Sequence, residues 1–191
     1  MNVAILFGRK NSKSIKNKNI LKIFSKPMFE YPIDAAKKVK EIHRIYVSSD
    51  SSYILAKAKK RGCIPINRPK HLCNDKALLE DAIQHAVNYC QTIHNNKIEN
   101  FIILLCNSIC VRHIDIKKGL QLLNKSKKFN TVTTVSKFNN FSPVRAKKIK
   151  NQNLLNYIPN KNLRKFTPLS CDRDKSVHSY YCTQSFTISR A

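Results

Sequence analysis

An alternation of short apolar segments with amphipathic helical segments, sustained over the first 135 residues, most constrains what this chain can fold into. The segments that predict strands are NVAILF at 2–7, RIYVSSD at 44–50, CIPINRP at 63–69, NFIILLCNS at 100–108 and NTVTTVSKF at 130–138. The segments with helical spacing of apolar residues are 27–40, 51–62, 74–93 and 113–126. Strands that alternate with helices indicate βαβ units, so we expect a three-layer α/β/α, Rossmann-like fold with a mainly parallel sheet.

Local signals set the expected ends of these helices. Gly62 would close the second helix, because glycine readily adopts the left-handed conformation that ends many helices. Asn74 or Asp75 would cap the helix at 74–93, since their side chains can accept bonds from the first amides. From residue 141 onward the sequence predicts short strands and loops.

Length and composition indicate a single globular domain that spans residues 1–191. A chain of 191 residues, 42% of them hydrophobic, can bury one sizeable core but is short for two. The net charge of +25 suggests a polyanionic partner: nucleic acid, anionic lipid or nucleotide phosphates. Part of the lysine excess belongs to solvated faces, because richness in Lys, Asn and Ile is typical of an AT-biased genome. Nucleic acid is disfavoured, because aromatic residues, 8% of the chain, do not alternate with basic ones.

Cysteine usage and hydropathy indicate a reduced, cytoplasmic protein. The seven cysteines include no CxxC pair and no regular spacing, so neither a disulfide framework nor a zinc site is predicted. We expect no signal peptide, because no basic segment precedes the first apolar segment. No apolar run reaches the ~20 residues that a membrane-spanning helix needs, so no membrane partner is expected.

The segment GRKNSKSIKNKN, residues 8–19, is the strongest candidate for a ligand site. It follows the first predicted strand, and ligands of open α/β folds bind at the carboxyl ends of the strands. The other loops expected at this edge are 48–50, 106–112 and 136–145. Transfer at the α-phosphorus of a triphosphate needs cations around the phosphates, which Arg9 and Lys13 can supply. The segment has neither the GxxxxGK[ST] nor the GxGxxG pattern, so spacing alone leaves two interpretations open: a phosphate grip or a solvated basic loop.

Several motifs in series resemble the CMP-sialic acid synthetase (acylneuraminate cytidylyltransferase) family. GRKNSKSIKNKN resembles the family's R-G-G-S-K-x-I-P-x-K-N, with matches at Arg9, Ser12, Lys13, Ile15, Lys18 and Asn19. KPMFEYPIDAAKK is similar to K-P-L-x-x-x-x-I-x-x-A, and RIYVSSDSSYILAKAKKRG to V-x-V-S-T-D-x-x-x-I-A-x-x-A-x-x-x-G. NRPKHLCNDKA is similar to R-P-x-x-L-A-x-D-x-A, with matches at Arg68, Pro69, Leu72, Asp75 and Ala77. The resemblance covers nearly the whole chain.

The resemblance implies a nucleotide-diphosphosugar transferase fold and a cytidylyltransferase activity. CTP and a sialic-acid-like 2-keto sugar acid would give a CMP-sugar and pyrophosphate, with Mg²⁺ as cofactor, for the synthesis of cell-surface polysaccharide. A homodimer is also implied. Arg9 and Lys13 would be the catalytic cations. The implied nucleotide-binding residues are Arg9, Ser12, Lys13, Asn19, Arg68, Asp75, Cys106 and Ser108.

Two arginines are candidates for the sugar acid. Arg145, in SPVRAKKI, suits the sugar carboxylate because a guanidinium can donate two parallel hydrogen bonds to it. Arg173, in SCDRD at 170–174, is either a sugar or metal contact or part of a local ion pair with the flanking carboxylates.

The chain departs from the family pattern in the loop after the fourth predicted strand and at its end. LLCNSICVR replaces L-L-Q-P-T-S-P-L-R, so Cys106 stands where the family's glutamine would contact the base and Ser108 replaces threonine. The chain ends at Ala191, near where the family's region with acidic metal ligands would begin, so the metal ligands are unknown. The alternatives are an inactive or truncated relative that only binds nucleotide or sugar, and a basic nucleic-acid-binding protein.

Overall fold

The computed structural model describes residues 1–10, 15–74, 76–137, 146–163 and 179–191, and it divides into two compact units. The larger unit consists of Met1–Thr134 and Gln184–Ala191, and the smaller one of Val135–Thr183. The two units are distinguished by the contacts that residues make within each of them, whereas a domain is defined by its ability to fold independently. The single domain expected from the sequence therefore stays a prediction.

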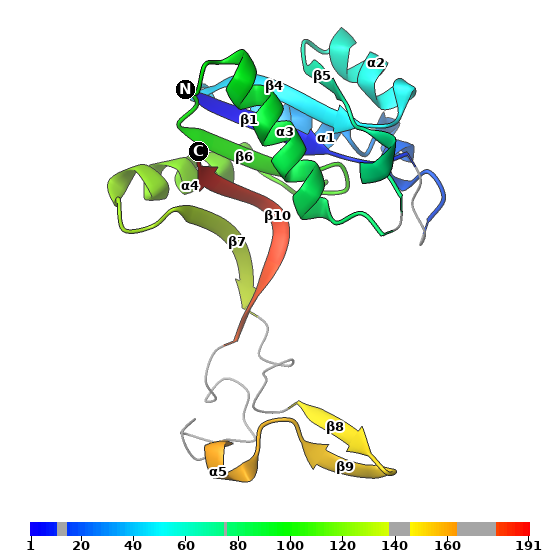
Figure 1. Cartoon of the computed structure of the whole chain (residues 1–191), viewed down its shortest axis with the longest axis vertical. Helices are drawn as coiled ribbons and strands as arrows, with labels where there is room; N and C mark the ends of the chain where they lie inside the picture. The colour runs from blue at the N-terminus through cyan, green and yellow to red at the C-terminus, as the bar shows by residue number, and fades with distance from the viewer. Residues whose placement is uncertain (11–14, 75, 138–145, 164–178) are drawn as a thin grey trace. The chain divides into compact units, whose positions relative to one another are not determined.

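A six-stranded sheet forms the centre of the larger unit, with strand order β5-β4-β1-β6-β10-β7 (Figure 1). The strands are β1 (Asn2–Phe7), β4 (Ile42–Ser49), β5 (Ile64–Asn67), β6 (Asn100–Leu105), β7 (Thr131–Lys137) and β10 (Tyr180–Arg190). Strand β1 pairs in parallel with β4 and β6, and β4 pairs in parallel with β5. Strand β10 is antiparallel to β6. The mainly parallel sheet predicted from the sequence is confirmed.

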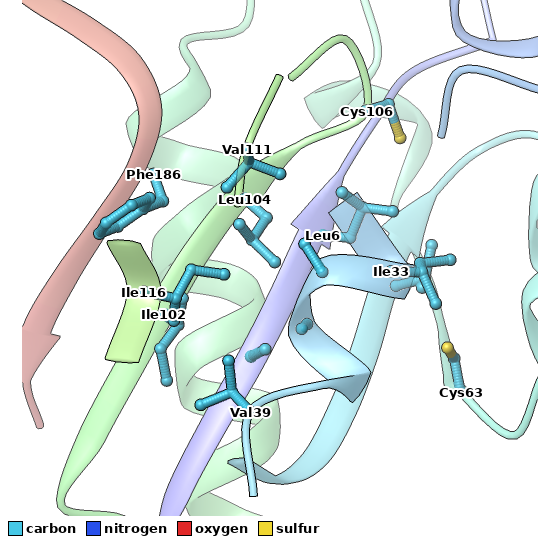
Figure 2. Close-up of a cluster of buried hydrophobic side chains, with 14 of the residues drawn as sticks. Leu6, Ile33, Val39, Cys63, Ile102, Leu104, Cys106, Val111, Ile116 and Phe186 are labelled. Atoms are coloured by element: carbon cyan, nitrogen blue, oxygen red, sulfur yellow. The ribbon is translucent and has the colours of Figure 1, made fainter. Parts of the chain in front are cut away.

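Helices cover both faces of this sheet, which confirms the predicted three layers. One face carries α1 (Glu30–Lys37), α2 (Ser52–Lys60) and α4 (His113–Lys125), and the other carries α3 (Leu79–Ile93). All six residues of β1 are buried, because alternate side chains enter two different cores. Leu6 joins the cluster of Figure 2, where it lies among side chains of α1, β6 and α4 such as Ile33, Ile102 and Ile116. Ile5 enters the opposite core, which packs against α3.

Helix α3 begins at Leu79, so the predicted cap at Asn74 is wrong. The side-chain oxygen of Asn74 accepts hydrogen bonds from the backbone N–H groups of Lys76 and Ala77, at 2.8 and 3.0 Å. These bonds close a turn ahead of the helix, a use of asparagine that competes with capping. Asp75, the other predicted cap, lies outside the described residues.

A small hairpin between β1 and α1 was not expected from the sequence. Strands β2 (Lys22–Ile23) and β3 (Lys26–Pro27) pair antiparallel, after a 3-10 turn at Lys18–Ile20. The two turn residues, Phe24 and Ser25, have φ angles of 47° and 65°. Glycine or asparagine usually occupies such left-handed positions, so the sequence carries no turn signal here.

The smaller unit contains a two-stranded sheet of β8 (Lys147–Lys150) and β9 (Asn153–Asn156), followed by the short helix α5 (Asn160–Leu163). The short strands predicted for this region are confirmed, whereas β10 is a long strand that joins the main sheet. None of the helices in the described part of the chain is both long and apolar enough to cross a membrane.

Candidate functional site

The candidate site lies at the carboxyl ends of the parallel strands, around β1. The strand order reverses between β1 and β6: β4 and β5 follow on one side of β1, whereas β6 lies on the other. Ligands of open α/β sheets bind at such a reversal point, because loops diverge there and leave a crevice. Here the strand ends lead into Gly8, Asp50, Arg68 and Cys106.

Gly8 is required by the close approach of the β1 and β6 loops. A Cβ atom at this position would lie 2.2 Å from Sγ of Cys106, which is closer than two non-bonded atoms can approach. The two loops are also joined by backbone, since the Cys106 N–H donates to the Phe7 carbonyl at 2.9 Å. The Gly8 N–H donates to the Ser48 carbonyl on the β4 side, at 3.3 Å. Any side chain at residue 8 would therefore separate the loops.

The first loop is held at its start and at its end by side chains. The Lys10 N–H donates to Oδ1 of Asp50 at 2.6 Å, and Nδ2 of Asn19 donates to the Arg9 carbonyl at 2.9 Å. Asn19 is 9% exposed, and its own carbonyl accepts the Phe29 N–H at 3.1 Å. Asn19 thus links the loop to the beginning of α1.

Arg68 is buried beside these loops, with only 8% of its surface exposed. Its Nε donates to Oγ of Ser48 at 3.3 Å and its Nη2 to the Ser48 carbonyl at 2.8 Å. The guanidinium carbon lies 5.8 Å from the centre of the Phe7 ring. Burial lowers the pKa of the Arg68 side chain, and the neighbouring groups of Cys73 and Asp50 oppose that shift. Arg68 keeps its charge, and its polar neighbours offset part of the cost of burying that charge.

The segment after Arg68 lies against the first loop. Nη1 of Arg9 donates to the Asn74 carbonyl at 3.1 Å. The Cys73 thiol donates to the Pro69 carbonyl at 3.1 Å, and burial raises the pKa of that thiol. Arg9 thereby ties residues after β1 to residues after β5.

Cys106 is 1% exposed, at the end of β6 (Figure 2). Burial raises the pKa of its thiol to about 12, so the thiol is neutral at ordinary pH. In the same loop the Ser108 N–H donates to the Leu105 carbonyl at 3.0 Å. At the start of α4, both carboxylate oxygens of Asp115 accept bonds from Arg112, at 2.7 and 2.9 Å, and this hydrogen bonding lowers the pKa of Asp115.

The structure places five of the predicted site residues at one edge of the sheet: Arg9, Asn19, Arg68, Cys106 and Ser108. The contacts above connect the first four of them through Gly8, Ser48 and Asn74. The other predicted site residues lie outside the described residues: Ser12, Lys13, Asp75, Arg145 and Arg173. Their roles, and those of the five described residues, stay predictions.

Ser48 and Asn74 contribute contacts that the sequence did not assign to the site. Ser48 belongs to the SSD run that ends β4, and small polar residues at the end of a strand were the signal available for it. Asn74 contributes its backbone carbonyl, which no sequence pattern identifies. Within the described residues there is no group of three or more His, Cys, Asp or Glu side chains that could hold a metal ion.

This sheet, with its strand reversal and its loops joined at the carboxyl edge, has the fold of the nucleotidyltransferases. The solved structure of CMP-2-keto-3-deoxy-manno-octonic acid synthetase in complex with CTP is similar over 99% of this chain and 73% of that chain, with a TM-score of 0.68 and 18% identity. The model of the cytidylyltransferase family matches residues 3–162. The chain belongs to the cytidylyltransferase family, as its motifs predicted.

Two curated relatives share recognisable sequence with this chain. It is 33% identical over 151 residues to the Helicobacter pylori pseudaminic acid cytidylyltransferase and UDP-2,4-diacetamido-2,4,6-trideoxy-beta-L-altropyranose hydrolase, covering 78% of this chain and 28% of that protein. It is 30% identical over 142 residues to the N-acylneuraminate cytidylyltransferase of Escherichia coli, covering 74% of this chain and 33% of that protein. The chain thus spans about a third of the length of these relatives.

Proposed function

We propose that the protein transfers CMP from CTP to a 2-keto sugar acid of the sialic or pseudaminic type, releasing pyrophosphate. The observation that carries the proposal is the joining of the first loop, the end of β4 and Arg68 at the reversal point beside β1, in a chain of the cytidylyltransferase family. The names of the two relatives support the choice of sugar acid. A CMP-sugar is an activated sugar used in nucleotide-sugar biosynthesis. We further propose that the enzyme is cytoplasmic and that its product is used to build cell-surface polysaccharide.

The proposed reaction needs no nucleophile from the protein. The anomeric hydroxyl oxygen of the sugar forms a bond to the α-phosphorus of CTP, the bond from that phosphorus to the pyrophosphate oxygen breaks, and the hydroxyl proton leaves to solvent. Catalysis then consists of holding the reactants in line and stabilising charge on the phosphates.

In this proposal Arg9 and Lys13 supply the positive charge around the triphosphate, and Ser12 and Asn19 help to form the loop. Because a guanidinium carries several N–H donors in a fixed fork, the bond from Arg9 to the Asn74 carbonyl is compatible with a phosphate contact. Arg68 is assigned to the nucleotide.

The remaining assignments concern the base and the sugar. We place the β6 loop with Cys106 and Ser108 next to the base, and assign Asp75 to the nucleotide. Arg145 and Arg173 are assigned to the sugar acid. The thiol of Cys106 packs against Gly8, so the β6 loop would present its backbone to the base.

We propose that CTP binds together with Mg²⁺, because a divalent cation on the phosphates neutralises the negative charge that develops on them during transfer. The described residues do not form a site for it. Asp50 is engaged by the Lys10 N–H, and no cluster of three ligating side chains occurs in the described part of the chain. We therefore derive no step through the metal, and its requirement is left to experiment.

The test is pyrophosphate release from CTP and Mg²⁺ with a panel of sialic, legionaminic, pseudaminic and 3-deoxy-octulosonic acids. Lys13→Ala is compared with Lys59→Ala, a matched change at an exposed lysine of α2. We expect release with one sugar acid, loss of at least tenfold in kcat/KM in Lys13→Ala, and unchanged release in Lys59→Ala. Chelation of Mg²⁺ should stop the reaction.

Two results would refute the proposed function. If the folded protein releases no pyrophosphate with any sugar but binds CTP by calorimetry, it is an inactive relative. If it neither releases pyrophosphate nor binds CTP, the edge around β1 is not a nucleotide site.

A further inference from the structure

We propose that Asp50 is a positioning residue for the start of the first loop, whose carboxylate fixes the Lys10 backbone, and with it the neighbouring Arg9, before CTP arrives. The effect on CTP rests on the proposed function, whereas the clamp on the backbone rests on geometry alone. The role is separate from contact with substrate, because the carboxylate acts through the loop.

The geometry of Asp50 suits a clamp. Its Oδ1 accepts the Lys10 N–H at 2.6 Å, which is short for an N–H···O hydrogen bond and is typical of one assisted by charge. Asp50 itself stands between two fixed neighbours. Ser49 is the last residue of β4 and its Oγ accepts the Ser51 N–H at 3.0 Å, while Oγ of Ser51 caps α2 by accepting the Ile54 N–H at 3.4 Å. The backbone of Asp50 is therefore fixed between a strand end and a helix start.

The Asp50 bond completes a set of three restraints on the start of the loop. The Gly8 N–H is held by the Ser48 carbonyl, and the Arg9 carbonyl is held by Nδ2 of Asn19. Each of the three consecutive residues is thus held by a hydrogen bond: Gly8 and Lys10 to residues at the end of β4, and Arg9 to Asn19 at the far end of the loop itself. Of these three partners, Asp50 is the charged one, and it holds Lys10, the last of the three residues.

The surroundings of Asp50 favour the clamp over direct binding of a metal ion. Its charge acts on the buried guanidinium of Arg68, where it opposes the effect of burial on that side chain. The positive charge of Arg68 acts against the binding of a second cation at this carboxylate. Asp50 also belongs to no group of three ligating side chains among the described residues.

Three substitutions separate geometry from charge. Asp50→Asn keeps an oxygen at Oδ1 and removes the charge. Asp50→Glu keeps the charge and moves the oxygens by one methylene. Asp50→Ala removes both. A clamp is retained in Asp50→Asn and lost in the other two, whereas a metal ligand or a purely electrostatic role is retained best in Asp50→Glu.

The first measurement is hydrogen exchange of the Lys10 amide in the ligand-free protein. We expect exchange in Asp50→Ala and Asp50→Glu to be at least tenfold faster than in wild type, because the acceptor of that amide is lost or displaced. Asp50→Asn should exchange within about threefold of wild type. Asp81→Ala, at an exposed carboxylate of α3, should leave the exchange unchanged. Melting temperatures identify any variant that fails to fold, and Asp50→Asn against Asp50→Glu still decides the outcome.

The second measurement is the affinity for CTP, together with kcat and KM. Loss of the clamp lowers the fraction of molecules in which Arg9 and Lys10 are held in place, and the apparent affinity for CTP falls by that fraction. We expect CTP to bind about 10- to 100-fold more weakly to Asp50→Ala and Asp50→Glu, with KM rising more than kcat falls, and Asp50→Asn to restore binding.

Three outcomes would overturn the positioning role. The first is unchanged exchange of the Lys10 amide in Asp50→Ala. The second is rescue by Asp50→Glu but not by Asp50→Asn. The third is faster exchange without weaker CTP binding. If wild type itself fails to bind CTP, the proposed function falls, and the exchange rates alone decide whether the clamp exists.

Discussion

Replacing Gly8 by alanine should strongly destabilise the protein, because the loops after β1 and β6 approach too closely for a side chain. The added Cβ would lie 2.2 Å from Sγ and 2.9 Å from Cβ of Cys106. Overpacking of a filled core costs about 1–3 kcal/mol. For a chain of 191 residues each kcal/mol lowers Tm by roughly 2–4 °C, so we expect Gly8→Ala to lower Tm by roughly 2–12 °C.

Thermal unfolding of a double-mutant cycle tests this reasoning. Cys106→Gly removes the two nearest atoms that meet the new Cβ and leaves Nδ2 of Asn19 at 3.3 Å, so Gly8→Ala in that background should cost at least about 1 kcal/mol less than in wild type. Gly119→Ala is the matched control: its Cβ meets the side-chain ends of Ile188 and Phe186, which can turn away, and alanine gains helix propensity. Additive costs at residues 8 and 106, or equal losses in Gly8→Ala and Gly119→Ala, would refute the close approach.

Two further predictions concern thiols and the β2–β3 turn. Burial raises the pKa of the Cys90 and Cys106 thiols from 9.0 to about 12. Between these two pH values a thiol ionises in the unfolded chain but stays protonated in the folded one. The stability that these thiols contribute is therefore fully present below pH 9 and is lost as the pH rises toward 12. In denaturant titrations over this range, Cys90→Ala should make the fall in unfolding free energy shallower by up to ~1.4 kcal/mol per pH unit, and an unchanged slope would contradict the burial of the thiol. Phe24 is 94% exposed at φ 47°, so Phe24→Gly should raise the unfolding free energy by ~1 kcal/mol in the same assay, and a loss of stability would show that the ring makes contacts that matter.

The sequence predicted the layers of the fold because periodicity reports which faces of a segment are buried. Residues 2–7 are apolar throughout, and β1 is buried on both faces. The predicted start of α3 was wrong, because the side-chain oxygen of Asn74, which could have capped a helix, instead closes a turn. The β2–β3 hairpin was missed, because Phe24 and Ser25 occupy left-handed positions that their side chains do not favour.

The location of the site could be predicted, whereas its internal contacts could not. The alternation of strands and helices placed the segment after the first strand at the carboxyl edge of a parallel sheet, and the motifs supplied Arg9, Asn19 and Arg68. Two of the contacts that hold these residues use the backbone carbonyls of Ser48 and Asn74, which leave no trace in residue identity. The closeness of Gly8 to Cys106 depends on the separation of β1 and β6, which is a property of the packed sheet.

The buried guanidinium of Arg68 connects the groups that hold the edge around β1. A charge removed from water is costly unless hydrogen bonds and an opposite charge compensate for it. Arg68 receives this compensation from two bonds to Ser48, from the Phe7 ring and from the charge of Asp50. Ser48 also holds Gly8, and Asp50 also holds Lys10, so the groups that stabilise the arginine are those that fix the first loop. The net charge of +25 belongs to the whole chain, but the start of the loop is held by this small set of hydrogen bonds around a buried arginine.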